Sequence, residues 1–220
     1  MSTRTTLGPR GSPAPFRFVT IPEACAVTGL TRKQVDHILA RELATLHVAT
    51  KRQGQRVLSE LGLCLVEVAN AYRESLTSPI RKVIYRLLAQ DPSKDTVEHK
   101  DDICSLTVRV DMCKHRVQEG LKALENAKAS ISADPEIMRG EPCIKGTRIP
   151  VYALAAIAEA KGPEAALRTY PQCSLHHVEA ARRYALAYPP RGRPKSNAPK
   201  ARDHKVSRKV VRKKVKSLAA

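Results

Sequence analysis

Aromatic residues are scarce in this chain of 220 residues: they make up 4% of it, with two phenylalanines and no tryptophan. Because the strands of β-sandwiches are rich in aromatic side chains, this scarcity favours small helical modules packed by aliphatic residues. Long apolar runs are missing too, and none approaches the roughly 20 residues of a membrane-spanning helix. The polar N-terminus has no secretory core. We therefore expect a cytoplasmic protein without a membrane partner.

Sequence motifs for metal binding and catalysis are also missing. The six cysteines include no CxxC pair, and most lie in apolar patterns, which indicates free thiols in a reducing compartment. Cys173, His176 and His177 are close in sequence, but a zinc site needs about four ligands and no second cluster completes this one. The chain has no phosphate-binding loop, dinucleotide loop or paired-carboxylate motif. We expect neither an enzyme nor a metal or other cofactor.

Positive charge is what the chain has in excess, since its formal net charge is +18. Residues 191–220 contain twelve Lys or Arg and one acid, Asp203, so they carry +11 and leave +7 for the first 190 residues. A basic tail on a moderately basic body predicts a polyanionic partner. A membrane surface is one candidate, but no segment is apolar enough to enter it, so nucleic acid is the expected partner.

Two capped helices are predicted near the N-terminus. Thr20 and Glu23 have the spacing of a capping box, and Gly29 suits the end of the helix that they begin. Thr31 and Gln34 form a second capping box, which opens a longer helix with one apolar face. Two helices joined by a short turn that contains glycine predict a helix-turn-helix.

A β-hairpin should follow the second helix, because two short apolar stretches flank a basic turn around Gly54. The apolar residues are Leu46, Val48, Val57 and Leu58. Ser59 can then cap a further helix. Helix, turn, helix, hairpin and helix in this order predict a winged helix-turn-helix over residues 18–75. The order resembles the N-terminal DNA-binding domain of the MerR-type regulators.

The winged helix-turn-helix also predicts which side chains contact DNA. The start of the second helix would lie over base edges in the major groove, and cations of the hairpin would contact phosphates. A solvated polar helix face is the alternative, but the capped helix before it and the basic hairpin after it favour DNA contact. The predicted contact residues of this domain are Thr31, Arg32, Lys33, Gln34, His37, Lys51, Arg52 and Arg56.

Residues 76–130 are predicted to form a connector of helix, strand and helix. The first helix should end at Asp91-Pro92, and the charged segment 93–102 is expected to be a loop. Apolar and polar residues alternate over 106–110, as in a half-buried strand. The helix predicted at 112–128 would pack either on a neighbouring helix or on a second subunit, and the second alternative would make it a dimer interface. A homodimer is expected because helix-turn-helix proteins commonly bind two-fold operators.

Residues 131–189 carry the most specific motifs of the chain. The motif residues are Asp134, Pro135, Gly140, Pro142, Gly146, Thr147, Arg148 and Pro150, followed by Tyr170-Pro171 and the run AARRYA at 180–185. This segment resembles the family of domain of unknown function 433 (DUF433). The resemblance implies an antitoxin-type domain, whose partner would be a nuclease toxin of the PIN type. The order of winged helix, this domain and a basic tail is similar to that of VapB-type antitoxins.

The residues of this segment by themselves predict less than the resemblance does. Gly140 and Gly146 bracket a short apolar strand, and Gly146-Thr-Arg148 should form a tight turn, so a small hairpin is the plain interpretation. Three helices should follow, with Ser174 as the cap of the last one. The helix, the turn with Pro171 and the capped helix are again helix-turn-helix-like. We expect the motif to fix a turn rather than to contact a ligand.

Both ends of the chain are expected to be disordered. Residues 1–17 are rich in Pro, Gly, Ser and Thr and should form a flexible arm, and residues 190–220 should form a basic tail. The tail contains the Arg-Gly-Arg-Pro core of an AT-hook, whose arginines suit the narrow minor groove of A·T-rich DNA. An ordinary basic linker is the alternative. The predicted hook residues are Arg191, Gly192, Arg193, Pro194 and Lys195.

These features predict a mainly α protein with an N-terminal winged helix-turn-helix, a second small helix-turn-helix-like C-terminal domain, short β-hairpins and disordered termini. The expected function is that of an antitoxin, which neutralises a cognate PIN-type ribonuclease toxin and binds operator DNA to repress its own operon. The antitoxin part depends on the resemblance alone. The alternatives are a stand-alone transcription regulator and a nucleoid-associated protein, both without a toxin partner.

Overall fold

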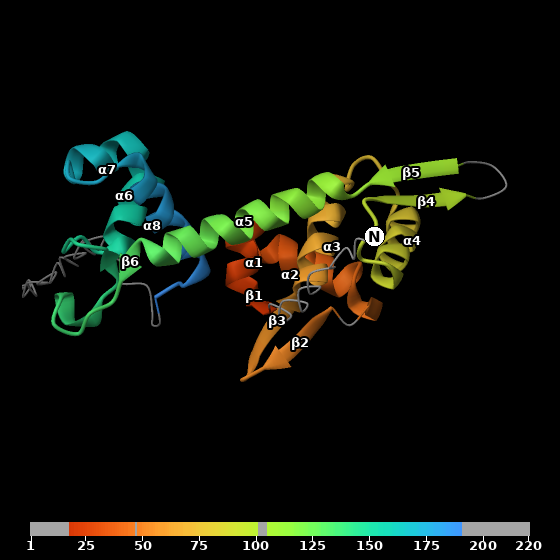
Figure 1. Ribbon diagram of the computed structural model, residues 1–220, viewed down its shortest axis with the longest axis horizontal. Coiled ribbons are helices and arrows are strands. Elements are labelled where there is room, and N and C mark those ends of the chain that lie inside the picture. The colour runs from red at the N-terminus through yellow and green to blue at the C-terminus, as the bar shows by residue number, and fades with distance from the viewer. Residues whose placement is uncertain (1–17, 47, 101–104, 191–220) are drawn as a thin grey trace, which may run out of the picture. The chain divides into compact units, whose positions relative to one another are not determined.

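The computed structural model describes residues 18–46, 48–100 and 105–190. Eight α-helices and short strand pairs form this part of the chain, so the predicted mainly α architecture with short β-hairpins is confirmed (Figure 1). Within it, no helix combines the length and the apolar character needed to cross a membrane. The predicted arm, residues 1–17, lies outside the described residues.

The first two helices begin where the sequence predicts. α1 (Ile21–Thr28) and α2 (Arg32–Arg41) each start with a complete capping box. In α1, the Glu23 carboxylate accepts the Thr20 backbone N–H at 2.8 Å, and the Thr20 hydroxyl accepts the Glu23 N–H at 3.4 Å. α1 ends at Gly29, whose φ of 73° is the left-handed conformation that glycine adopts without strain. The tight turn after Gly29 lets the apolar faces of both helices join one core.

A three-stranded antiparallel sheet lies beside these helices, in the order β1-β3-β2. Its strands are β1 (Phe18–Thr20), β2 (Ala49–Arg52) and β3 (Gln55–Ser59). The β2–β3 turn has Gln53 at φ 48° and Gly54 at φ 76°, and two left-handed residues match the twist of a tight hairpin. The predicted hairpin is therefore confirmed.

The predicted start of the first hairpin strand was wrong. Leu46 and Val48 were expected in this strand, but Leu46 ends the 3-10 helix η1 (Ala44–Leu46), and Val48 lies directly before β2. β1 was not predicted, because three residues are too few to show an alternating pattern. It is recognised only through its partner, since Val19 lies opposite Leu58 of β3 and both are buried.

A second hairpin replaces the loop that was predicted over residues 93–102. After α3 (Glu60–Ala71) and α4 (Ser78–Gln90), the strands β4 (Thr96–Lys100) and β5 (Ser105–Arg109) pair antiparallel. β4 has one buried side chain among its charged residues, Val97, which lies opposite the buried Val108. A single buried residue gives no alternating pattern in the sequence. The strand at 105–109 agrees with the predicted alternation.

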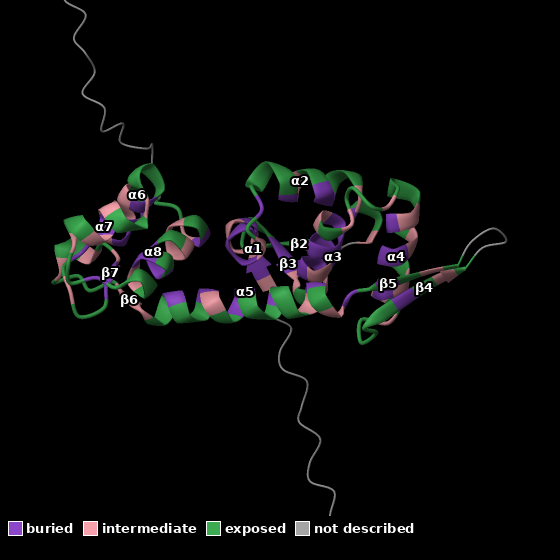
Figure 2. Cartoon of the chain, turned by 90° about the horizontal axis from the view of Figure 1, so that it is seen from above, coloured by how far each residue is buried: buried purple, intermediate pink, exposed green. Residues whose placement is uncertain are grey.

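The longest helix, α5 (Asp111–Ala129), packs against α1 and α3 (Figure 2). At its middle it approaches α1 very closely, at Gly120. A Cβ atom added to Gly120 would lie 2.4 Å from the backbone oxygen of Val27 and 2.9 Å from its Cγ1. Only glycine therefore allows the two helices to cross at this separation. α5 thus packs against α1 on the side opposite α2 (Figure 2).

The C-terminal part has its own buried cluster, in which alanines separate larger residues such as Leu154 and Val178. It contains a short strand pair and three helices. The elements are β6 (Ile131–Ser132), the 3-10 helix η2 (Met138–Gly140), β7 (Cys143–Ile144), α6 (Val151–Lys161), α7 (Pro163–Thr169) and α8 (Leu175–Ala187). The predicted Ser174 cap of α8 is present, since its hydroxyl accepts the His177 N–H at 3.4 Å.

α8 also packs against α1, so the C-terminal helices contact the N-terminal ones directly. Arg183 donates from Nη1 to the backbone oxygen of Ala26 at 3.0 Å, and the Tyr188 hydroxyl donates to Glu23. Lys128 lies 3.4 Å from the same carboxylate. Burial opposes ionisation of Glu23, but these contacts with Tyr188 and Lys128, together with those from Thr20, hold its pKa below the usual value.

Candidate nucleic-acid interface

The start of α2 presents an exposed polar face. Arg32, Lys33 and His37 are exposed there, as predicted for residues that reach outward. Thr31 and Gln34 are exposed as well, but they bond each other. Gln34 Oε1 accepts the Thr31 backbone N–H at 2.9 Å and its hydroxyl at 2.7 Å. The side chains of Thr31 and Gln34 thus stabilise the start of α2. Arg32, Lys33 and His37 are the ones available for contacts outside the protein.

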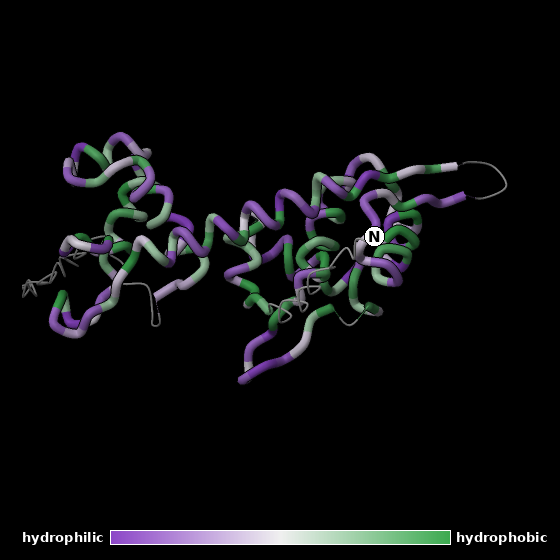
Figure 3. The backbone as a smooth tube through the Cα atoms, viewed as in Figure 1, coloured by the Kyte–Doolittle hydropathy of each residue, from purple (hydrophilic) through white to green (hydrophobic). Residues whose placement is uncertain are grey.

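The β2–β3 hairpin supplies a second group of exposed cations, at a hydrophilic tip (Figure 3). Lys51 and Arg56 lie directly opposite each other, and Arg52 lies opposite Gln55. The guanidinium of Arg52 lies over the ring of Phe18, with Cζ 3.7 Å from the ring centroid. This cation–π contact holds Arg52 at the sheet surface while its N–H groups stay accessible.

One acidic residue, Asp36, links the two cationic groups, and the sequence did not single it out. Asp36 Oδ1 lies 3.3 Å from Nη1 of Arg56 on the hairpin, and its Oδ2 lies 3.6 Å from Nε of Arg32, one turn earlier in α2. The side chains are 75% exposed for Arg32, 43% for Asp36 and 50% for Arg56, so the cluster lies at the surface. Each ion pair is worth little stability there, but the Asp36 carboxylate lies within ion-pair distance of both arginines.

The other end of α2 is held by a buried ion pair. Glu42, the residue at the C-terminal cap of α2, accepts two bonds from Arg81 of α4, at 3.0 Å from Nε and 2.8 Å from Nη2. The Tyr85 hydroxyl donates to the same carboxylate at 2.6 Å. Burial opposes ionisation of Glu42, but the bonds from Arg81 and Tyr85 outweigh it, and the pKa of Glu42 lies below its usual value. This network keeps the direction of α2 fixed.

The DUF433-type motif forms a turn, as the sequence analysis expected. Gly146 adopts φ 77°, and the Thr147 hydroxyl donates to the Ile144 oxygen at 2.8 Å while it accepts the Ile149 N–H at 3.1 Å. Arg148 is exposed, and Pro150 occupies the N-cap position of α6 without a side-chain capping bond. The side chains of this turn thus serve its own geometry.

The first half of the motif builds the loop before β7, and its members are Asp134, Pro135, Gly140 and Pro142. Asp134 Oδ1 accepts the Glu136 N–H at 2.9 Å, and the Pro142 oxygen accepts the Val151 N–H at 2.9 Å. Gly140 is the last of three consecutive left-handed residues, with φ of 50° at Met138, 58° at Arg139 and 78° at Gly140. These contacts are again local.

Cysteines and histidines show no arrangement typical of a catalytic or metal site in the described part of the chain. No group of three or more His, Cys, Asp or Glu there could hold a metal ion. Burial raises the pKa of the Cys64 thiol to about 12 and that of Cys113 to about 11, so neither is a ready nucleophile. His177 accepts the Ser174 N–H through Nδ1 at 3.2 Å and thus belongs to the cap of α8.

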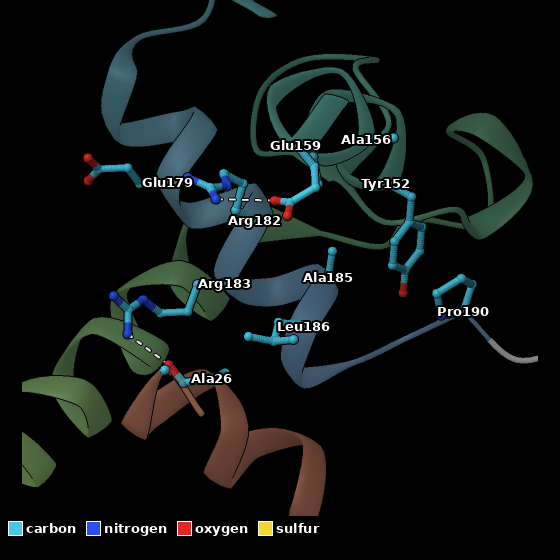
Figure 4. A pocket seen from close by; sticks show the side chains of 12 residues that line it. Ala26, Tyr152, Ala156, Glu159, Glu179, Arg182, Arg183, Ala185, Leu186 and Pro190 are labelled. Atoms are coloured by element: carbon cyan, nitrogen blue, oxygen red, sulfur yellow. Dashed lines mark hydrogen bonds and ion pairs between the residues drawn. The ribbon is translucent and has the colours of Figure 1, made fainter. Parts of the chain in front are cut away.

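An open groove of about 800 Å³ lies along α6 and α8 and reaches α1 (Figure 4). Small residues, Ala155, Ala156 and Ala185, line it. The Glu159–Arg182 ion pair, 3.1 Å long, joins the two helices at its edge. Leu186 also lines the groove and is 50% exposed, although it is a large apolar residue. The groove is a candidate surface for a protein partner.

The predicted AT-hook lies outside the described residues. Its residues are Arg191, Gly192, Arg193, Pro194 and Lys195, and residues 196–220 of the basic tail lie outside the described residues as well.

The resemblance of the C-terminal part to DUF433 is confirmed. Residues 131–185 match the family model described as "Protein of unknown function (DUF433)". The chain is also 27% identical to uncharacterized protein y4eO of Sinorhizobium fredii over 199 residues, which cover 82% of this chain and 86% of that protein. No solved structure matches. Because the alignment with y4eO is much longer than the DUF433 segment, the similarity includes the helices and strands that precede it.

Proposed function

We propose that the chain is a DNA-binding regulator whose residues 18–75 act as a winged helix-turn-helix. The observation that carries the proposal is the pairing of two exposed cationic groups, at the start of α2 and on the β2–β3 hairpin, through Asp36. α2 would lie in the major groove with Arg32, Lys33 and His37 over base edges. Lys51, Arg52 and Arg56 would contact the flanking phosphates. The overall charge of +18 supports a polyanionic partner.

We further propose that the regulator is an antitoxin, which acts in the cytoplasm as a homodimer and neutralises a PIN-type ribonuclease toxin. This part rests on the resemblance of the C-terminal segment and of the domain order to VapB-type antitoxins. The groove along α6 and α8 supports a protein partner, because its alanine lining lets the backbone of a partner helix approach closely. A stand-alone regulator and a nucleoid-associated protein are the alternatives. Both would bind DNA and leave the groove without a toxin.

Removing two cations at the start of α2 tests the DNA-binding proposal. The double variant Arg32→Ala, Lys33→Ala is expected to bind the DNA upstream of its own gene at least about tenfold more weakly, because base contacts in the major groove are lost. Mobility shifts with the full chain, in the presence of competitor DNA, measure this. The matched control is Lys122→Ala, Lys161→Ala, which removes the same charge from exposed positions of α5 and α6. Equal losses of DNA affinity in both double variants would mean that the overall positive charge, and not the position of Arg32 and Lys33 on α2, accounts for binding.

Co-expression tests the antitoxin proposal. A reading frame that adjoins this gene and encodes a PIN-type nuclease is expected to stop growth alone and to be harmless beside the full chain. Leu186→Glu should weaken this protection, because it puts a charge on the groove lining while leaving the buried cluster of the C-terminal part intact. A neighbouring nuclease that stays toxic beside the wild-type chain would exclude the antitoxin function and leave a stand-alone regulator.

A further inference from the structure

The ion pair between Arg32 and Asp36 uses only one edge of the arginine. Asp36 approaches the Nε atom of Arg32, at 3.6 Å. A guanidinium carries five N–H donors in a rigid plane, so the edge formed by Nη1 and Nη2 is left for another acceptor. That edge has the geometry to donate two parallel hydrogen bonds to O6 and N7 of guanine, which is the commonest specific contact in the major groove.

Among the polar side chains of the first turn of α2, Arg32 is the one best suited to this contact. Gln34 is committed to the capping box with Thr31, and Lys33 has a single ammonium that cannot donate in a fixed plane. Arg32 alone combines a forked donor with a partner that restrains it, since its long side chain would otherwise lose much rotamer freedom on binding.

We propose that Asp36 is a positioning residue, which holds Arg32 where its guanidinium can contact a guanine. The preference of the protein for guanine at one position of its DNA site would then depend on this carboxylate. The inference rests on the proposed DNA-binding function and extends it to sequence recognition. Asp36 also forms an ion pair with Arg56 of β3, 3.3 Å away. The same carboxylate would therefore set the spacing between α2, which would contact bases, and β3, which would contact phosphates.

The charge of Asp36 gives the proposal a distinctive signature. A carboxylate at a surface that faces DNA repels phosphates, so its removal strengthens binding to any sequence. Its removal also frees Arg32, so the preference for guanine declines. Non-specific affinity and sequence preference therefore change in opposite directions. A residue that only stabilised the fold would lower both.

The experiment begins with the full chain and a pool of randomised duplex DNA, from which the preferred site is selected. Affinities are then measured for this site and for versions in which each guanine is exchanged in turn. Arg32→Lys should lower the preference at one guanine by at least about tenfold, because the bidentate contact is lost, while it keeps the affinity for unrelated DNA.

Asp36→Ala should lower the preference at that same guanine by a similar factor and raise the affinity for unrelated DNA. Asp36→Asn, which keeps the shape of the side chain, should do the same. Glu74→Ala is the matched control, since it removes an exposed carboxylate from the turn before α4 and should leave the preference unchanged. An unchanged preference in both Asp36 variants would overturn the inference and leave the proposed function standing. Failure of the wild-type chain to bind any DNA would overturn both.

Discussion

The Glu42→Ala variant is expected to lose about 3–5 kcal/mol of its free energy of unfolding, because the buried Arg81 guanidinium loses its counter-charge. Its Nη1 keeps bonds to the backbone oxygens of Arg73 and Leu76, but neither carries a negative charge. The side chains of Arg81 and Glu42 are 9% and 12% exposed, so water cannot replace the lost carboxylate. The Tyr85 hydroxyl, which is fully buried in α4, loses its acceptor as well. The loss would affect function too, since Glu42 ties the end of α2 to α4.

Chemical denaturation of the purified chain measures this loss, and Glu74→Ala, at an exposed position, should stay within about 0.5 kcal/mol of the wild type. The pH dependence adds a second readout. Because the folded pKa of Glu42 is lowered, its contribution is complete above the ordinary carboxyl pKa and is lost as the pH falls through the lowered value. Glu42→Gln should flatten this part of the acid profile. A loss below about 1 kcal/mol in Glu42→Ala would mean that the pair is not buried in solution.

Gly120→Ala is expected to destabilise the chain by about 1–3 kcal/mol, although alanine is the better helix former. Helix propensity alone predicts a gain of about 1 kcal/mol for this change. The new Cβ, however, would lie 2.4 Å from the backbone oxygen of Val27, far inside van der Waals contact. A backbone atom cannot move aside as a side chain can, so α1 and α5 would separate.

Thermal unfolding of Gly120→Ala beside Gln118→Ala, an exposed position of the same helix, checks this expectation. Gln118→Ala should be neutral or slightly stabilising. The sign of the effect at Gly120 decides the question, since a gain in stability would show that α1 and α5 do not cross as closely as the structure indicates.

The elements that could be predicted from the sequence are those whose causes lie within a few residues. Both capping boxes, the Gly29 helix end and the Gly54 turn depend on neighbours in the chain, and each is present in the structure. β1 and β4 were missed because their evidence is distant. β4 has one buried residue, Val97, and it becomes a strand only through pairing with β5.

The candidate site shows the same division. Arg32, Lys33 and His37 were predicted from helix position, and they are exposed. Thr31 and Gln34 were predicted both as a cap and as DNA contacts, and the structure has them bonded to each other. Asp36 was not predicted, and a carboxylate considered alone opposes DNA binding. Its partner Arg56 is 20 residues away, and the Glu42–Arg81 pair spans 39 residues, so neither pairing could be recognised from local spacing.

Site-specific crosslinking tests the central claim, DNA binding through α2, most directly. Figure 2 shows α2 and α5 on opposite sides of α1 and α3, so a photoreactive residue at Lys33 and one at Gln118 probe two different surfaces of the same full chain. The basic tail is identical in both proteins and contributes equally. We expect crosslinks to the selected duplex from position 33 and none above background from position 118. Crosslinks of equal yield from both positions, or from position 118 alone, would contradict the account.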